Sequence, residues 1–350
     1  MPVPMRTGSP PAALLIWTLL SIRHVSPKAV QTEPKLPLNR RNSSPGSELI
    51  RMRPIRNRLV RVLSVFVLAS NLAIPLAART ASPAGEWVVV VSVANMYSSA
   101  TENADVVSQA ILGSDVVVLE RRHKWAKVRT PDQYTGWMPV RELRKLRAGI
   151  YAAPGHAIQV ESLFANIYRE TDVTAHQPLL TVPFESRLEP VAEASADAGR
   201  WLQVRLPDGR TAWIQNSDVM RDPKPLTIDE SIALAKRFLG LPYLWGGRST
   251  YGYDCSGFTQ MLVRSRGINM PRDADLQAAW EGVAAVDRKE LRAGDLLFFG
   301  GSADKITHTG MYIGGGEFIH DTTNGHPVIQ ISRLDDQPWT RLLVACRRVK

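Results

Sequence analysis

The sequence predicts a multidomain protein in which two small all-β barrels are followed by an α+β domain. In the first half of the chain, a stretch of short alternating strands and polar turns occurs twice. After Pro223 the pattern changes to helical spacing and then to strands separated by glycines. The 350 residues, of which 44% are hydrophobic and 22% charged, are enough for two or three folded domains.

The N-terminal region carries the whole excess of positive charge. Residues 1–80 contain 12 of the 43 Lys and Arg residues but only two of the 33 acidic residues. The rest of the chain therefore has 31 basic and 31 acidic residues, and no net charge. Because non-specific binding to nucleic acid requires excess positive charge on the folded body, the sequence argues against a nucleic-acid partner.

A leader of residues 1–81 precedes the first predicted strand. Five arginines between positions 51 and 61 lead into an apolar run over residues 59–78, and small residues follow. This order is typical of a secretory signal peptide, here residues 52–81. A membrane anchor is the alternative, but polar residues interrupt the run, so we expect no stable anchor. We predict export across the inner membrane to the periplasm, with translation starting at Met52.

The two copies of the internal repeat span residues 87–146 and 156–221, here called the first and second repeats. Residues 125–132 align with residues 201–208 at an offset of 76, and an earlier segment aligns at an offset of 71. Five residues are therefore inserted within the second repeat. Short strands joined by Pro-Asp turns are typical of small antiparallel barrels, and the kind of barrel stays open at this point.

The C-terminal domain, residues 226–350, begins with a predicted amphipathic helix over residues 228–239. Gly240 ends this helix. Helical spacing places four apolar residues on one face: Ile228, Ile232, Ala235 and Phe238. Because helices come first and strands follow, the pattern favours an α+β domain.

Cys255 is a candidate nucleophile because it lies at the start of a second predicted helix, with Asp254 as its N-cap. Unpaired N–H groups and the helix dipole stabilise a thiolate there, so we expect a lowered pKa for this thiol. A buried structural cysteine is the alternative, which the polar and glycine neighbours disfavour. Cys346 lies in an apolar terminal strand and is predicted to be a buried core thiol without a disulfide.

Two histidines lie on one predicted β-hairpin. His308 belongs to an alternating strand, residues 314–316 are three glycines that turn the chain, and His320 lies on the return strand. A hairpin centred at either 314 or 315 places both imidazoles on one face, within reach of each other. One histidine can then accept the thiol proton while the other orients it. A zinc site with Cys255, or two core histidines, are the alternatives.

Five ordered motifs of the C-terminal domain carry a resemblance to a known family. They are Gly240-Leu-Pro-Tyr243-Leu-Trp-Gly-Gly247, Asp254-Cys-Ser-Gly257, Gly294-Asp-Leu-Leu-Phe-Phe299, His308-Thr-Gly-Met-Tyr-Ile-Gly314 and Phe318-Ile-His320. Together they resemble the NlpC family of papain-like cell-wall cysteine peptidases. The resemblance implies Cys255 as nucleophile, His308 as base and His320 as the orienting third residue. It also implies cleavage of peptidoglycan stem peptides between γ-D-glutamate and a diamino acid, here expected to be diaminopimelate.

The repeats resemble bacterial SH3-like domains. Members with two such domains resemble γ-D-glutamyl-L-diamino acid endopeptidases, which implies short muropeptides with a free N-terminal L-Ala as substrates. Asp273 matches the acid that binds the free amine, and Ser256 matches the serine after the nucleophile. Tyr134 fits the aromatic that closes the pocket, since the second repeat has Arg210 at that position. The alternatives are a solvated Tyr134 and an Asp273 that only caps a helix.

The expected chemistry requires no metal or organic cofactor. The Cys255 thiolate attacks the amide carbon, and the Cys255 N–H and the Tyr243 hydroxyl stabilise the oxyanion. His308 then protonates the leaving amine. The predicted substrate-binding residues are Tyr134, Tyr243, Asp254, Ser256 and Asp273.

Two other functions compete with this prediction. One is a wall-binding module on an inert catalytic fold, which the presence of Cys255, His308 and His320 disfavours. The other is an amidase or acyltransferase on the same scaffold, which uses the same cysteine and histidine. Release of a dipeptide from a defined muropeptide separates the peptidase from both.

Overall fold

A computed structural model describes residues 86–147, 149–153, 155–191 and 199–350. The predicted leader, its signal peptide and the proposed start at Met52 lie outside these residues. Within the described part of the chain, no helix is long and apolar enough to cross a membrane.

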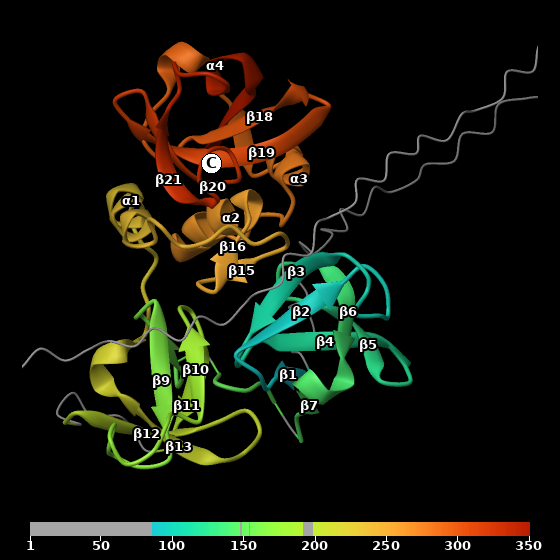
Figure 1. Cartoon of the computed structure of the whole chain (residues 1–350), viewed down its shortest axis with the longest axis vertical. Coiled ribbons are helices and arrows are strands. Elements are labelled where there is room, and N and C mark those ends of the chain that lie inside the picture. Colours follow the sequence, from blue (N-terminus) through green and yellow to red (C-terminus); the bar gives the residue numbers. More distant parts are fainter. Residues whose placement is uncertain (1–85, 148, 154, 192–198) are drawn as a thin grey trace, which may run out of the picture. The chain divides into compact units, whose positions relative to one another are not determined.

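The first repeat forms one antiparallel sheet with the strand order β3-β2-β6-β5-β4-β1-β7 (Figure 1). Its strands are β1 (Trp87–Val89), β2 (Val93–Tyr97), β3 (Val106–Ile111), β4 (Asp115–Arg122), β5 (Trp125–Arg129), β6 (Thr135–Pro139) and β7 (Leu143–Lys145). Alternate residues such as Ala94, Met96, Val128 and Met138 are buried and form its core. The alternating apolar residues therefore point into one core, as expected for β-strands.

The second repeat forms a sheet with the corresponding order, β10-β9-β13-β12-β11-β8-β14. Its strands are β8 (Ile158–Val160), β9 (Phe164–Tyr168), β10 (Leu180–Pro183), β11 (Arg187–Pro190), β12 (Trp201–Arg205), β13 (Thr211–Gln215) and β14 (Val219–Arg221). Ile167, Leu202, Val204 and Ile214 belong to its separate core.

The two sheets repeat individual contacts as well as strand order. Tyr97 pairs with Trp137 across the first sheet, and Tyr168 pairs with Trp213 across the second. Tyr97 also packs edge to face on Trp125, with ring centroids 5.5 Å apart. Tyr168 packs in the same way on Trp201, with ring centroids 5.4 Å apart. The sequence repeat is therefore a structural repeat.

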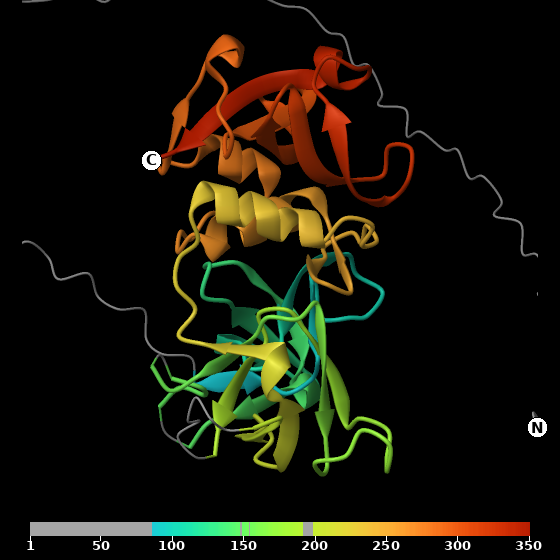
Figure 2. The same ribbon diagram turned by 90° about the vertical axis from the view of Figure 1, so that its left-hand side faces the viewer.

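The C-terminal domain is α+β, as predicted. Its antiparallel sheet has the order β17-β22-β18-β19-β20-β21. Its elements are α1 (Ile228–Arg237), β15 (Arg248–Ser249), β16 (Gly252–Tyr253), α2 (Cys255–Ser265), α3 (Ala274–Ala279), β17 (Val283–Ala285), β18 (Leu296–Ser302), β19 (Lys305–Gly314), β20 (Glu317–Thr322), β21 (Val328–Arg333), α4 (Trp339–Leu342) and β22 (Leu343–Val349). Helix α2 packs against β19 and β20, and α1 packs against α2 (Figure 2).

Local sequence explains where α1 begins and ends. Thr227 and Glu230 form a reciprocal capping box at its start, and Gly240 follows its end with a positive φ of 85°. Ile232 is buried on the predicted face, whereas Ile228 on the same face is 38% exposed. Ile228 lies in the first turn, where Gly294 covers only part of its side chain.

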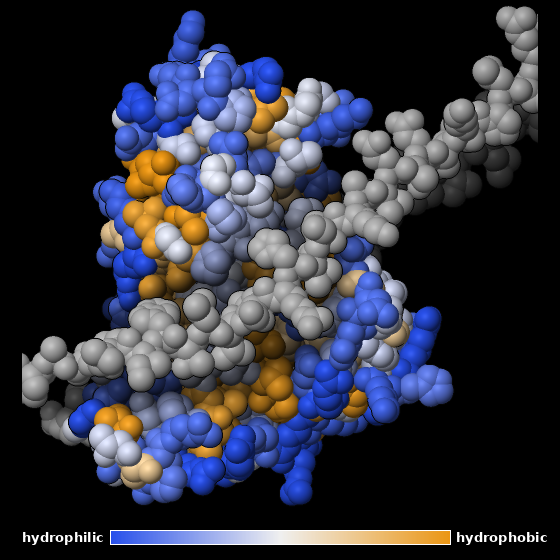
Figure 3. Space-filling model, in the orientation of Figure 1, coloured by the Kyte–Doolittle hydropathy of each residue, from blue (hydrophilic) through white to orange (hydrophobic). Residues whose placement is uncertain are grey.

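The surface of the C-terminal domain is mixed. Figure 3 shows polar and charged side chains over much of the visible face, with apolar side chains gathered between α1 and β21. Leu239, Trp245 and Ile331 are among the exposed apolar residues of this domain.

Candidate active site

Cys255 is the first residue of α2, and the predicted helix start is confirmed. Asp254 occupies the N-cap, where its Oδ1 accepts a 2.7 Å hydrogen bond from the Gly257 N–H. Gly257 has no room for a side chain, since a Cβ there would lie 2.2 Å from the Gly247 oxygen. Cys255 is 7% exposed, and the helix that it starts is packed into the core.

The predicted lowering of the thiol pKa is wrong. Burial, followed by the neighbouring Asp254 carboxylate, raises the pKa of Cys255 to about 12. The backbone N–H groups of Thr309 and Ser256 and the charge of Arg272 act in the opposite direction but do not prevail. The sequence predicted the helix start and its Asp254 cap, but not that burial and the charge of Asp254 would raise the pKa of the thiol. Without substrate, the thiol is therefore neutral and needs a base to ionise.

The two histidines meet as the hairpin predicts. Met311 pairs with Ile319, so the hairpin is centred at residue 315 and the histidines are diagonal neighbours. His308 Nε2 lies 2.8 Å from His320 Nδ1, and His320 Nε2 lies 3.0 Å from the Ser332 Oγ. These hydrogen bonds, from Ser332 to His320 and from His320 to His308, fix the orientation of the His308 ring.

Both imidazoles are held in the neutral form. Burial lowers the pKa of His308 to about 4, against which the Asp254 charge acts weakly. Burial, and then the charge of His308, lowers the pKa of His320 well below its usual range. A neutral imidazole can accept a proton, so His308 has the form that a general base requires.

Trp339 encloses the histidine pair and was not identified from the sequence. Its ring stacks on His308 with centroids 5.3 Å apart at 29°, and it meets His320 edge to face at 4.7 Å. It comes from α4, far along the chain, and no motif links it to the histidines. The backbone N–H of Thr309, the residue after His308, is one of the groups that lower the pKa of Cys255.

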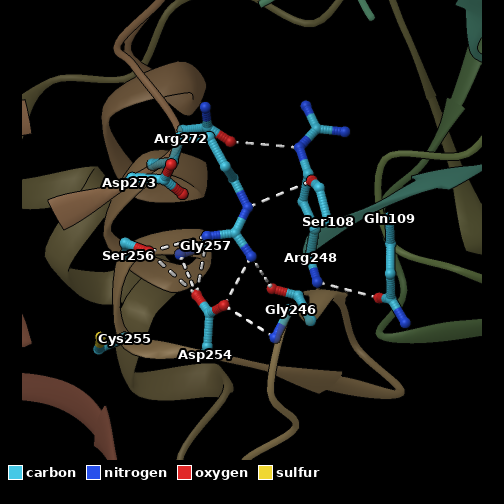
Figure 4. Close-up of polar contacts among 12 residues, drawn as sticks. Ser108, Gln109, Gly246, Arg248, Asp254, Cys255, Ser256, Gly257, Arg272 and Asp273 are labelled. Atoms are coloured by element: carbon cyan, nitrogen blue, oxygen red, sulfur yellow. Dashed lines mark hydrogen bonds and ion pairs between the residues drawn. The ribbon is translucent and has the colours of Figure 1, made fainter. Parts of the chain in front are cut away.

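The N-cap residue Asp254 forms a buried ion pair with Arg272 (Figure 4). The Arg272 guanidinium donates to both Asp254 carboxylate oxygens, at 2.9 and 2.7 Å, and to the Ser256 hydroxyl at 2.8 Å. It also donates to Ser108 of the first repeat at 3.3 Å. Arg272 is 2% exposed, so its hydrogen bonds compensate for the loss of water around the charges. The predicted pocket residues Asp254 and Ser256 therefore belong to one network.

Asp273 and Tyr134 are brought together across 139 residues of sequence. The Tyr134 hydroxyl donates to the Asp273 Oδ2 at 3.2 Å. Asp273 is the N-cap residue of α3, and its side chain makes no capping hydrogen bond. Tyr134 is half-buried rather than solvated. A fully solvated Tyr134 is therefore wrong, whereas a role of Asp273 beyond the start of α3 stays a prediction.

The ionisation of this pair reflects their burial. Burial, and then the Asp273 charge, raises the pKa of Tyr134 to about 12, so the tyrosine remains a donor. Burial raises the pKa of Asp273, while Arg272 and the Tyr134 hydrogen bond lower it. Burial, followed by the charges of Cys255 and Asp254, raises the pKa of Tyr243 above its usual range.

Further contacts tie both repeats to the C-terminal domain. From the first repeat, Asp132 accepts a hydrogen bond from Gln260 at 3.0 Å, and Gln109 accepts one from the Arg248 N–H at 3.0 Å. From the second repeat, Glu185 pairs with Arg264 at 2.5 Å.

Cys346 is a free, buried core thiol, as predicted, 6% exposed in a cluster with Phe299 and Trp339. In the part of the chain that the structure describes, no group of three or more His, Cys, Asp or Glu side chains could hold a metal ion.

Comparison with protein families gives three matches along the chain. Residues 240–348 match the NlpC/P60 family, residues 96–143 match the bacterial dipeptidyl-peptidase Sh3 domain, and residues 151–220 match the GW dipeptide domain.

Two curated relatives are named gamma-D-glutamyl-L-lysine dipeptidyl-peptidase. The Bacillus cereus protein is 34% identical over 61% of this chain and 66% of its own length. The Bacillus subtilis protein is 31% identical over 75% of this chain and 87% of its own length. A crystal structure of an NlpC/P60 family protein from Bacillus cereus aligns with a TM-score of 0.64 at 28% identity, over 75% of this chain and 99% of that one.

Proposed function

This chain belongs to the NlpC/P60 family of cysteine peptidases, and from that premise we propose that it hydrolyses peptidoglycan stem peptides. The bond that we propose is the amide between γ-D-glutamate and the following diamino acid, in short muropeptides with a free N-terminal L-Ala. The observation that supports this choice is the Tyr134–Asp273 contact, in which a hydroxyl of the first repeat donates to a carboxylate of the C-terminal domain.

The proposed reaction begins with proton transfer. His308 accepts the Cys255 proton, and the thiolate attacks the γ-carbonyl carbon of D-glutamate. The Cys255 N–H and the Tyr243 hydroxyl stabilise the oxyanion. His308 then gives the proton to the amine of the diamino acid, which leaves. Water, deprotonated by His308, hydrolyses the thioester and releases L-Ala-γ-D-Glu.

In this proposal Asp273 selects the substrate. The free ammonium of L-Ala pairs with the Asp273 carboxylate, which Tyr134 holds in place by its hydrogen bond. Peptides whose L-Ala amine is acylated lack the ammonium, so they would leave the Asp273 carboxylate without a cationic partner from the substrate. Peptides with a free L-Ala terminus are therefore favoured over stem peptides still attached to the glycan.

We further propose that both repeats are closed SH3-like barrels and that the protein works in the periplasm after export. The family match of the first repeat to a dipeptidyl-peptidase Sh3 domain supports this organisation. The domains proposed are residues 87–146, 156–221 and 226–350. The relatives are named for L-lysine; we propose diaminopimelate as the diamino acid here.

The test is hydrolysis of L-Ala-γ-D-Glu-diaminopimelate and of its lysine counterpart, with release of L-Ala-γ-D-Glu followed by mass spectrometry. We expect release by the wild type and none by Cys255→Ala, with Cys346→Ala as the control that retains activity. Equal release by Cys255→Ala would reject the peptidase. Equal cleavage of the N-acetylated tripeptide would reject the role of Asp273 while leaving the peptidase intact.

A further inference from the structure

Gln277, in α3, is a buried side chain that the proposed reaction does not use. Its exposed fraction is 0%. Its Nε2 donates to three backbone carbonyls, those of Ser256 at 3.0 Å, Pro271 at 3.0 Å and Arg272 at 3.2 Å. Three carbonyl oxygens can face only the donor end of an amide, so these contacts fix which way the side chain points. The Gln277 Oε1 is buried and has no hydrogen-bond partner among the described residues, so the side chain is bound through its donor end.

The carbonyls that Gln277 binds belong to two separate parts of the site. Ser256 is the residue after the nucleophile, in the first turn of α2. Pro271 and Arg272 directly precede Asp273 in the chain. The backbone N–H of Gln277 also donates to the Asp273 carbonyl, at 2.9 Å. One residue therefore connects three successive carbonyls that end at Asp273 to the start of the helix that carries the nucleophile.

The segment of residues 270–273 has no regular structure of its own. It lies between the end of α2 and the start of α3, outside any helix or strand. Buried backbone without a ladder of hydrogen bonds needs other partners to keep one position. Gln260 supplies one at the start of the segment, where its Nε2 donates to the Met270 carbonyl at 2.9 Å. Gln277 supplies those that adjoin Asp273, so it helps to set how far this residue lies from the nucleophile.

That distance matters for the peptide proposed as substrate. Its scissile γ-carbonyl and its free ammonium are separated by a fixed number of bonds. The ammonium can pair with Asp273 while the γ-carbonyl faces Cys255 only if the two protein groups are spaced to match. A fixed spacing also disfavours a terminal amino acid whose amine lies one carbon further along.

We propose that Gln277 is a positioning residue that sets the spacing between Asp273 and the nucleophile, and thereby selects peptides that begin with an α-amino acid. It acts through backbone carbonyls rather than by contact with the reacting atoms. This inference rests on the proposed function, and within it on recognition of the free amine by Asp273.

The test compares two peptides that differ by one methylene, glycyl-γ-D-Glu-diaminopimelate and β-alanyl-γ-D-Glu-diaminopimelate. Both are given to the wild type and to Gln277→Met, since methionine has a similar length but no donor. We expect the wild type to favour the glycyl peptide at least about tenfold in kcat/KM. In Gln277→Met we expect most of this preference to be lost, through a higher KM for the glycyl peptide with little change in kcat.

Ser231→Ala is the matched control. The Ser231 hydroxyl is also buried and also donates to a carbonyl of α2, that of Leu262 at 3.1 Å, but towards the end of the helix far from the nucleophile. This variant should keep the wild-type preference. If Gln277→Met does not fold, Gln277→Asn is measured instead, because its shorter amide cannot reach both groups of carbonyls.

The outcomes separate this inference from the proposed function. A Gln277 variant that keeps the full preference for the glycyl peptide would overturn the inference and leave the peptidase intact. Equal losses of kcat on both peptides would also overturn it, because they indicate damage at the nucleophile rather than a displaced Asp273. A wild type that cleaves both peptides equally well would show that no spacing is selected. A wild type that cleaves neither would reject the proposed function, and this inference with it.

Discussion

The first and second repeats have the same strand order and the same tyrosine–tryptophan contacts, but they contact different parts of the C-terminal domain. The first repeat supplies polar side chains around the candidate active site: Ser108, Gln109, Asp132 and Tyr134. The second repeat instead contacts α1 and α2, through Glu161 and Glu185. Its Phe184 packs edge to face on Phe238 at 5.4 Å, within the core of the C-terminal domain.

One turn explains much of this difference. In the first repeat, Asp132 and Tyr134 reach Gln260 and Asp273 of the C-terminal domain. At the aligned positions of the second repeat, Asp208 and Arg210 bind each other, and Arg210 is exposed. Buried residues keep the fold of a repeat, so its turns are free to take on separate roles.

The largest effect is expected where the first repeat meets the buried ion pair. Arg272→Ala leaves the Asp254 carboxylate buried without its partner, which costs about 3–5 kcal/mol of unfolding free energy. Urea denaturation measures this loss, and we expect peptidase activity to fall with it. Arg292→Ala, at an exposed position of the same domain, serves as the control and should change stability by less than about 0.5 kcal/mol. A mild effect of Arg272→Ala would mean that the ion pair is not the structural centre of the site.

The second repeat should affect stability rather than catalysis. Phe184→Ala removes an aromatic ring from the core of the C-terminal domain and should cost about 3 kcal/mol. At a temperature where the variant is folded, we expect its KM for the free-amine peptide to match that of the wild type. Val173→Ala, exposed in the same repeat, provides the baseline. A selective rise in KM would show that the second repeat also shapes the pocket.

Tyr134 should behave in the opposite way. Tyr134→Phe removes one hydrogen bond to a carboxylate and should lower kcat/KM for the free-amine peptide about tenfold, with little loss of stability. The N-acetylated peptide should be unaffected. Arg210→Ala changes the aligned residue of the second repeat and should alter neither rate. Equal losses on both peptides would contradict a role for Tyr134 in amine recognition.

The smallest effect is a shift in pH dependence. Burial raises the pKa of Asp273, so the carboxylate that binds the ammonium is lost, and KM rises, at a higher pH than for an ordinary aspartate. The Tyr134 hydrogen bond lowers this pKa. Tyr134→Phe should therefore move the acidic limb of kcat/KM to higher pH by less than about one unit. A shift to lower pH would contradict the contact.

The sequence predicts those parts of the fold and site that depend on short segments. The helix start at Cys255, the hairpin of His308 and His320 and the repeat itself all follow from local spacing, and the structure confirms them. The pKa of Cys255 could not be predicted in the same way. Its helix start is visible in the sequence, whereas its burial and the effect of the Asp254 charge depend on tertiary packing.

Residues that act over long sequence distances leave no local pattern. Trp339 stacks on His308 from a short helix near the C-terminus, and Arg272 joins Asp254 to Ser108 of the first repeat. Family resemblance assigned Tyr134 and Asp273 separately to the pocket, but their contact was not predicted, because no spacing links residues from two domains. Ile228 shows a smaller limit, since helical spacing gives the face of a helix but not how far the core extends along it.

The most direct test of the account is a double-mutant cycle between the first repeat and the site. It measures kcat/KM for L-Ala-γ-D-Glu-diaminopimelate in the wild type, Tyr134→Phe, Asp273→Asn and the double variant. If Tyr134 acts by holding the Asp273 carboxylate, the double variant will be no slower than Asp273→Asn alone. Losses that multiply fully in the double variant would show that the two residues act independently, and would contradict a pocket completed by the first repeat.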